Sequence, residues 1–141
     1  MKTTQAEIQQ FLQREFPQSL EHCVIEDVVS MGATLRHKIS LDQLRPGGTV
    51  SGPTMMTLAD FALYVAILGE IGLVALAVTT NMNINFLRKP AGGQDIRGVC
   101  KLMKVGKTLI VGEVWIYSVD SPDPVAHVTA SYSIPPRREL R

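Results

Sequence analysis

The sequence predicts an α+β fold in which a curved antiparallel sheet of about six strands wraps around one long central helix. The segment GGTVSGPTMMTLADFALYVAI, residues 47–67, is apolar or small at nearly every position, so the helix that it forms must be enclosed. The segments around it resemble strands joined by short turns, which favour antiparallel neighbours. One curved sheet can enclose such a helix, and a second copy of the chain can cover what remains.

The composition is that of a globular protein and speaks against several classes of function. The 141 residues suit a single domain, 1–141, with 45% hydrophobic and 19% charged residues. A net charge of +1 argues against a nucleic-acid partner. The N-terminus lacks the apolar core of a signal peptide, and no apolar run has the length of a membrane span without a charge or helix breaker. We therefore expect no membrane partner and a cytoplasmic location, with Cys23 and Cys100 as thiols.

Three elements are expected before the central helix. Apolar residues at helical spacing predict a short N-terminal helix, which Pro17 ends. Two β-rich segments then predict a hairpin. The expected ranges are 4–16 for the helix, within an N-terminal segment 1–17, and 22–30 and 33–41 for the strands. Alternation is expected to place four residues on one side of the second strand: Leu35, His37, Ile39 and Leu41.

The central helix is expected from about Pro53 to Gly69, because proline is favoured at the first helical position. Strand-like segments with turns between them follow. The first covers 73–89. Two more lie within 95–119, on either side of a tight turn at 105–107, and the last covers 124–134. A tail, 135–141, ends the chain. Alternation in the first of them is expected to place five residues on one side: Val78, Thr80, Met82, Ile84 and Phe86.

A polar stripe runs along the otherwise apolar central helix. Thr57, Asp60 and Tyr64 are spaced by three and four residues, so they share one face. Burial of an isolated carboxylate is costly, so Asp60 must be hydrogen-bonded, paired or protonated. One interpretation is structural, with Asp60 bound to a backbone group or paired across an interface. The other is a general base or nucleophile in a sheltered cleft.

The start of the same helix is the second feature of interest. Gly52 and its neighbours present unpaired N–H groups at the positive end of the helix dipole, where an oxyanion can bind, although a plain tight turn would look the same. Gly52 and Asp60 are eight residues apart, which is about 12 Å along one helix. One carbonyl cannot touch both groups. If both act on the same atom, they come from different subunits across a dimer interface.

Three segments resemble those of the hotdog-fold acyl-CoA thioesterases: GGTVSGxxxxxLADxA, TTNMNINFLRKPA and KVGKTLIVGEVWI. The similarity is greatest to the phenylacetate-pathway and 4-hydroxybenzoyl-CoA thioesterase type and covers 33–134. It implies a hotdog fold, an obligate homodimer and a dimer of dimers, the homotetramer. It also implies hydrolysis of an acyl-CoA substrate to a carboxylic acid and CoA, with no metal and no redox cofactor.

The resemblance also implies catalytic roles. Asp60 would activate water or attack the thioester carbonyl, while the Gly52 N–H of the opposite subunit would polarise the carbonyl oxygen. Thr79 is the nearest match to a hydroxyl that often assists. The chain departs from the family pattern at Ser51, where the family usually has histidine, and at Arg45, where many members have asparagine. Ser51 is a candidate catalytic residue that can donate a hydrogen bond, but it cannot act as a base near neutral pH.

Candidates for binding the substrate lie in three places. The phosphates of CoA need cations and backbone donors. Such groups occur at one strand end, Arg88 and Lys89, and in a basic turn, Lys104, Gly106 and Lys107, although each could be a solvated strand end. The polar stripe and the strand after it add Thr57, Tyr64 and Asn81. The three histidines have no metal-ligand spacing, so no metal site is expected.

Two other functions stay open. A hotdog dimer could bind an acyl-CoA or another acyl ligand without turning it over, and the departures at Ser51 and Arg45 favour this alternative. The second is an acyl-CoA hydratase or dehydratase, which usually pairs the aspartate with a histidine on a nearby loop. Asp60 has no such histidine in its motif.

Overall fold

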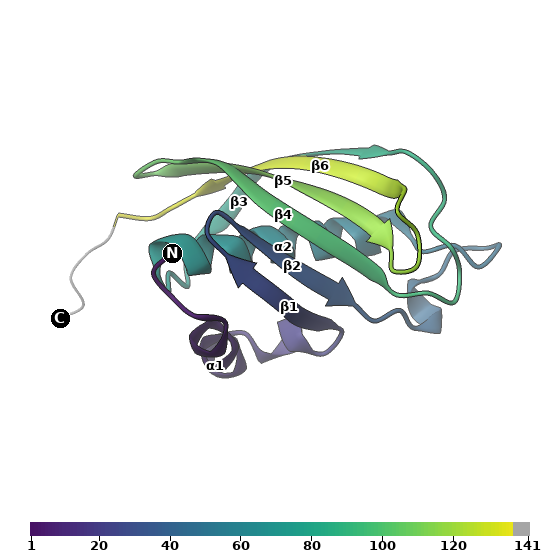
Figure 1. Cartoon of the computed structure of the whole chain (residues 1–141), viewed down its shortest axis with the longest axis horizontal. Coiled ribbons are helices and arrows are strands. Elements are labelled where there is room, and N and C mark those ends of the chain that lie inside the picture. Colours follow the sequence, from purple (N-terminus) through teal and green to yellow (C-terminus); the bar gives the residue numbers. More distant parts are fainter. Residues whose placement is uncertain (137–141) are drawn as a thin grey trace.

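The computed structural model describes residues 1–136, so positions 137–141 of the expected tail lie outside the described residues. The described chain forms two α-helices, two short 3-10 helices and six strands (Figure 1). The helices are α1 (Gln5–Glu15), η1 (Pro17–Leu20), η2 (Leu41–Gln43) and α2 (Gly52–Ile71). The strands are β1 (Cys23–Val29), β2 (Gly32–His37), β3 (Val78–Phe86), β4 (Ile96–Val105), β5 (Leu109–Ser118) and β6 (Pro124–Ser133).

All six strands form one antiparallel sheet in the order β1-β2-β4-β5-β6-β3. The sheet arches over α2, and α1 lies beside β1 (Figure 1). This arrangement confirms the predicted α+β fold with a curved sheet around one central helix and a short N-terminal helix. The two edges are β1 and β3. Within the described chain β3 pairs with β6 alone, so its other side is open.

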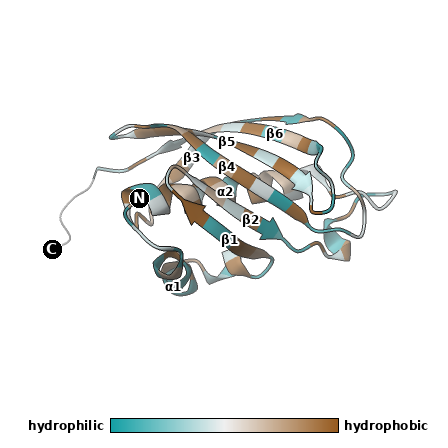
Figure 2. Ribbon diagram, in the orientation of Figure 1, coloured by the Kyte–Doolittle hydropathy of each residue, from teal (hydrophilic) through white to brown (hydrophobic). Residues whose placement is uncertain are grey.

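The core lies between α2 and the concave face of the sheet. Hydrophobic and hydrophilic bands alternate along the strands, so one face of the sheet is apolar (Figure 2). Two glycines on that face let the helix lie close to it: a Cβ atom at Gly98 would lie 3.1 Å from Leu58 Cγ, and one at Gly112 would lie 2.5 Å from Leu63 Cδ2. By length and composition alone α2 could span a membrane, but 72% of its most apolar window is buried within the protein.

The N-terminal helix is fixed at both ends. The Thr4 hydroxyl accepts a hydrogen bond from the Glu7 N–H at 3.2 Å, and the Glu7 carboxylate accepts one from the Thr4 N–H at 3.0 Å, which is a capping box. Ile8 and Leu12 are fully buried in the core. The helix ends before Pro17, as predicted. Phe16, which follows the last residue of α1, therefore has a defined position beside α2.

The second strand of the hairpin ends earlier than predicted. It stops at His37, and residues 41–43 form η2, which leaves Leu41 87% exposed rather than on the side of Leu35. A local capping box explains the change: the Ser40 N–H donates to Gln43 Oε1 at 2.9 Å, and the Ser40 side chain accepts from the Gln43 N–H. The Gln43 N–H also donates to the Ser40 carbonyl at 3.0 Å, which closes the 3-10 turn. These bonds compete with continued strand pairing.

The expected strand 73–89 is also shorter, because residues 73–77 form a turn and β3 covers only 78–86. A bulge at Thr80 interrupts the strand: Thr79 pairs with Tyr132, and the next paired residue is Asn81, opposite Ser131. The bulge changes the alternation, so Thr79 rather than Thr80 faces α2. The predicted single side for 78, 80, 82, 84 and 86 is therefore wrong across the bulge.

We predict that replacing Leu58 by alanine lowers the free energy of unfolding by about 2–5 kcal/mol, because this fully buried side chain lies between α2 and the sheet. The matched control is the same substitution at the exposed Leu41, which should change stability by less than about 0.5 kcal/mol. Urea denaturation followed by circular dichroism measures both. Equal losses at the two positions would contradict the described core.

Candidate active site

Helix α2 begins with an unpaired backbone donor. Gly52 is its first residue, one position before the predicted start, and Pro53 is the second. The Ser51 hydroxyl caps the helix: it accepts a hydrogen bond from the Thr54 N–H at 3.3 Å and lies 2.7 Å from the Thr54 hydroxyl. Within residues 1–136 the Gly52 N–H has no hydrogen-bond acceptor. It is therefore free to bind an oxygen atom at the positive end of the helix.

Cations gather beside this helix end. A pocket of about 550 Å³, here called the basic pocket, contains Gly52 together with Arg45, Arg88 and Lys89. Arg88 also donates a hydrogen bond to the Pro124 carbonyl. The ring of Phe86 covers Gly52 so closely that a Cβ atom there would lie 3.1 Å from Phe86 Cζ. The structure thus brings two of the predicted CoA-binding residues, Arg88 and Lys89, together with Gly52.

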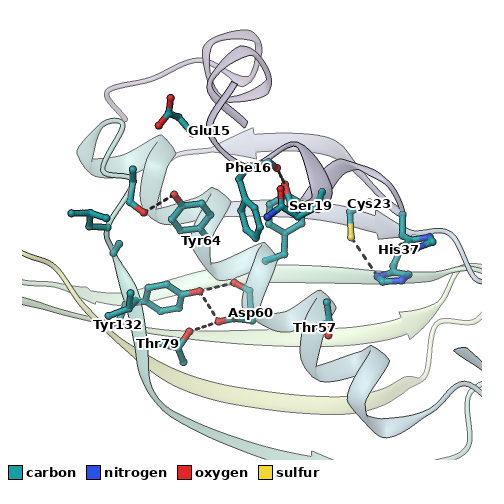
Figure 3. Close-up of a pocket in the computed structure, with 17 residues that line it drawn as sticks. Glu15, Phe16, Ser19, Cys23, His37, Thr57, Asp60, Tyr64, Thr79 and Tyr132 are labelled. Carbon is teal, nitrogen blue, oxygen red and sulfur yellow. Dashed lines mark hydrogen bonds between the residues drawn. The ribbon is translucent and has the colours of Figure 1, made fainter. Parts of the chain in front are cut away.

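The polar stripe of α2 borders a different pocket. This pocket, here called the Asp60 pocket, has a volume of about 700 Å³ and includes Thr57, Asp60 and Tyr64 on one wall (Figure 3). The Thr57 hydroxyl is bound to the Pro53 carbonyl at 3.0 Å, and the Tyr64 hydroxyl to the Ala75 carbonyl at 3.2 Å. Asp60 is half-buried because it borders this open space.

Two hydroxyl groups hold one oxygen of the Asp60 carboxylate. Thr79 on β3 donates to Oδ1, and Tyr132 on β6 donates to Oδ1 at 2.6 Å and to the backbone carbonyl of Asp60 at 2.9 Å (Figure 3). Burial, and after it the Asp60 carboxylate, raise the pKa of the Tyr132 phenol, so the phenol stays protonated and donates. Within the described chain Oδ2 has no donor. One oxygen is thus positioned and the other is open.

Sequence reasoning missed Tyr132. The available signal was its place on the buried side of the last strand, where a phenol needs a hydrogen-bond partner. The identity of that partner depends on the pairing of β3 with β6, which places Tyr132 directly opposite Thr79. A one-residue difference in this register would have directed the phenol elsewhere.

The other end of the Asp60 pocket contains a cysteine–histidine pair. Cys23 Sγ lies 3.4 Å from His37 Nδ1 (Figure 3). On the other side of the ring, Gln43 Nε2 lies 2.8 Å from His37 Nε2. Because Gln43 Oε1 accepts from the Ser40 N–H, the amide nitrogen faces His37 and donates to it. We therefore assign the ring proton to Nδ1, which faces the sulfur. The stacked ring of His22, 5.8 Å away, completes this end of the pocket.

The environment of this pair keeps both groups neutral. Burial raises the pKa of the Cys23 thiol to about 12. Burial lowers the pKa of His37, and the neighbouring His22 lowers it further. Since Nδ1 carries the proton, His37 cannot take one from Cys23. A cysteine beside a histidine can form a thiol nucleophile with its base. Here the thiol is buried and protonated, and the histidine nitrogen that faces it already carries a proton, so the pair does not suit this role.

The turn between β4 and β5 lies at the opposite end of the sheet from the basic pocket. The strand register places this turn beside the first residue of β3, whereas the basic pocket lies at the last residue of β3 and beyond it. The structure therefore does not bring these predicted binding residues together with Gly52. The group comprises Lys104, Gly106 and Lys107.

Two further expectations concern Asn81 and metals. Asn81 pairs with Ser131, next to the inward-facing Tyr132, so it lies on the face of the sheet away from Asp60. The structure does not place it in the Asp60 pocket or the basic pocket. In the part of the chain that the structure describes, no group of three or more His, Cys, Asp or Glu side chains is arranged to hold a metal ion.

Comparison with a family model and with a solved structure identifies thioesterases in both cases. Residues 47–124 match the model of the thioesterase superfamily. A candidate thioesterase from Silicibacter sp. is 40% identical, covers 96% of this chain and 94% of its own, and superimposes with a TM-score of 0.89. No match was found among curated protein sequences.

Two more distant structures share the fold. Zebrafish thioesterase superfamily member 2 is 20% identical over 94% of this chain and 99% of its own, with a TM-score of 0.81. The Escherichia coli PaaI protein, from the phenylacetic acid degradation operon, is 18% identical over 92% of this chain and 91% of its own, with a TM-score of 0.79. The segment that matches the family model contains both Gly52 and Asp60 and makes up more than half of the sequence. The chain therefore belongs to the thioesterase superfamily and has its hotdog fold.

Proposed function

We propose that the protein hydrolyses acyl-CoA thioesters at a site that two copies of the chain share. Asp60 acts as general base or nucleophile, and the Gly52 N–H of the other copy polarises the thioester carbonyl. One observation carries the proposal: the two groups belong to one helix but lie in different pockets, about 12 Å apart along its axis. A single carbonyl can reach both only if they come from different copies.

The edge strand β3 offers the means of bringing the two groups together. Near one end of β3, Thr79 is bonded to Asp60; at the other end, Phe86 lies against Gly52. If two copies of β3 pair antiparallel about the middle of the strand, the Thr79 end of one copy lies beside the Phe86 end of the other. Such pairing would also cover apolar residues of an unpaired edge, where Val78 is 56% and Phe86 54% exposed.

The proposed chemistry at the shared site uses two groups without a hydrogen-bond partner in the described chain, the Gly52 N–H and Asp60 Oδ2. The carbonyl oxygen accepts a hydrogen bond from the Gly52 N–H, which stabilises the negative charge that develops on it. Asp60 Oδ2 either takes a proton from the water whose oxygen bonds to the carbonyl carbon, or forms that bond itself. The carbon–sulfur bond then breaks and CoA leaves as a thiolate. If Asp60 formed the bond, the product is an anhydride between the acyl group and Asp60, and water then hydrolyses it to the carboxylic acid and the free carboxylate. Thr79 and Tyr132 hold Oδ1 and so orient the carboxylate.

The basic pocket is the proposed site for the phosphates of CoA. Arg45, Arg88 and Lys89 lie in one pocket near the Gly52 end of α2 and offer the cations that phosphates need. Arg45, one of the departures from the family pattern, thus adds to the positive charge of this pocket. The proposed reaction uses no metal and no redox cofactor.

Cys23 is the competing nucleophile, since it lies in the same pocket as Asp60. Attack by sulfur would require a thiolate, and burial disfavours that form. His37 cannot serve as its base, because Nδ1 donates toward the sulfur and Nε2 accepts from Gln43. Asp60, with one oxygen held and one open, has the geometry that the reaction needs.

We predict that Asp60→Asn lowers kcat/KM for acyl-CoA hydrolysis by about a hundredfold to ten-thousandfold, because the amide cannot accept a proton or form the new bond. The amide oxygen can still accept from Thr79 and Tyr132, so the fold should persist. Thiol release across a panel of acyl-CoAs measures the rate. The matched control, Asp27→Asn, changes an exposed carboxylate of β1 and should retain activity. Wild-type protein that binds acyl-CoA without hydrolysing it would favour a binding function instead.

We also predict that iodoacetamide leaves Cys23 unmodified and the protein active. With a thiol pKa of about 12, the thiolate fraction near pH 8 is about three orders of magnitude below that of a free cysteine, and it rises tenfold with each pH unit up to that pKa. Peptide mass spectrometry measures the alkylation. The control is denatured protein, in which both cysteines should react. Rapid alkylation of folded protein at Cys23 with loss of activity would contradict the assigned roles.

A further inference from the structure

We propose that Phe16 determines how long an acyl group the Asp60 pocket accepts. This inference rests on the proposed function, since it takes the Asp60 pocket as the place of the acyl chain. It concerns a part of the protein outside the segment 47–124 that matches the family model. Phe16 belongs to the junction of α1 and η1, which forms one wall of the pocket.

The ring of Phe16 lines the pocket between η1 and helix α2. It makes edge-to-face contacts with Phe61 and Tyr64 on α2, with ring centroids 6.4 Å and 6.3 Å apart. Figure 3 shows it beside Tyr64, above Asp60 and to the left of Cys23 and His37. An acyl chain that extends from a carbonyl at Asp60 toward the end formed by Cys23 and His37 shares the pocket with this ring.

The backbone holds Phe16 in place. Its N–H donates to the Leu12 carbonyl at 2.8 Å, and its carbonyl accepts from the Ser19 N–H at 3.1 Å and the Ser19 hydroxyl at 2.7 Å. Pro17 prevents the helix from continuing through this point. The helix that leads to it is anchored by buried side chains and by a bond from the Gln5 side chain to the Ile25 carbonyl at 3.0 Å. The backbone that carries the ring is thus held by hydrogen bonds on both sides of Phe16.

The chemistry of the wall favours an uncharged, apolar acyl group. Phe16, Phe61 and Tyr64 give the lining an aromatic part, and the far end offers a neutral thiol and a neutral imidazole. Glu15 also borders the pocket, so a terminal carboxylate on the acyl chain would meet a like charge. A volume of about 700 Å³ is in the range of pockets that enclose small organic ligands.

Two substitutions should change the selectivity in opposite directions. Phe16→Ala opens the path to the far end, so longer straight-chain acyl groups should gain about fourfold in kcat/KM for each additional methylene that becomes buried. Phe16→Trp narrows the path, so the preferred chain should become shorter. Loss of stability alone would lower all rates together and could not produce opposite changes in the length profile.

The test compares wild type, Phe16→Ala, Phe16→Trp and the exposed control Leu41→Ala on straight-chain acyl-CoAs from butyryl to palmitoyl. Thermal unfolding verifies that each variant is folded. Binding of the matching S-alkyl-CoA thioethers, which lack the carbonyl and cannot be hydrolysed, is measured by calorimetry. The expected result is a shift of both profiles to longer chains for the alanine variant and to shorter chains for the tryptophan variant, with Leu41→Ala unchanged.

The two readouts separate this inference from the proposed function. Hydrolysis by wild type with length profiles that stay the same in both variants would overturn the role of Phe16 and leave the proposed function intact. Thioether binding whose length dependence shifts as expected, without hydrolysis of any acyl-CoA, would support the role of Phe16 and contradict the thioesterase proposal. Absence of both hydrolysis and thioether binding would overturn both.

Discussion

The burial of α2 is the interaction on which the rest of the structure depends. A twenty-residue helix with apolar side chains on nearly all sides cannot remain exposed to water, so the sheet curves around it. Glycines at positions 98 and 112 allow the close approach that this enclosure needs. The strands do not close around the helix completely. The polar stripe of α2 borders the remaining space, which α1 and η1 cover in part, and the Asp60 pocket is the result.

Within this enclosure the polar groups near both pockets are mostly satisfied, which makes the exceptions informative. Ser51 caps the helix, and Thr79 and Tyr132 hold one oxygen of Asp60. Within residues 1–136 the Gly52 N–H and Asp60 Oδ2 have no such partner. One is a donor at the positive end of a helix and the other an acceptor with negative charge. They are the pair that addition to a carbonyl requires, but a single chain holds them too far apart.

Local patterns in the sequence predicted much of the fold. Apolar spacing located α1 and α2, and alternation with turn residues located β1, β4, β5 and β6 to within one or two residues. The errors arose where local hydrogen bonds, which the alternation of residues does not reveal, decide where a strand ends or which way its side chains face. The capping box of Ser40 and Gln43 ended β2 early, and the bulge at Thr80 changed which residues of β3 face the helix.

For the site, the sequence indicated Asp60 and Gly52, because a charge in an apolar helix and a glycine at its start are visible in one short segment. It could not indicate Tyr132, which is 72 residues from Asp60 and reaches it only through the register of two strands. The same limit applies to Phe16, whose place beside Phe61 depends on how α1 packs. Residues brought together by distant pairing leave little trace in a single sequence.

The central claim is that one active site takes Asp60 from one copy and Gly52 from another, and a hybrid dimer tests it most directly. One chain carries Asp60→Asn and the other Gly52→Pro, which removes the N–H. The extended backbone of Ser51 suits a following proline, and the Phe86 ring, 3.1 Å from the added Cβ atom, must shift by a few tenths of an ångström. Each variant alone should be inactive. A hybrid purified through two different tags has one site with both defects and one with neither, so it should regain about half of the wild-type thioesterase activity. A hybrid as inactive as its parents would place both groups in one chain and contradict the shared site.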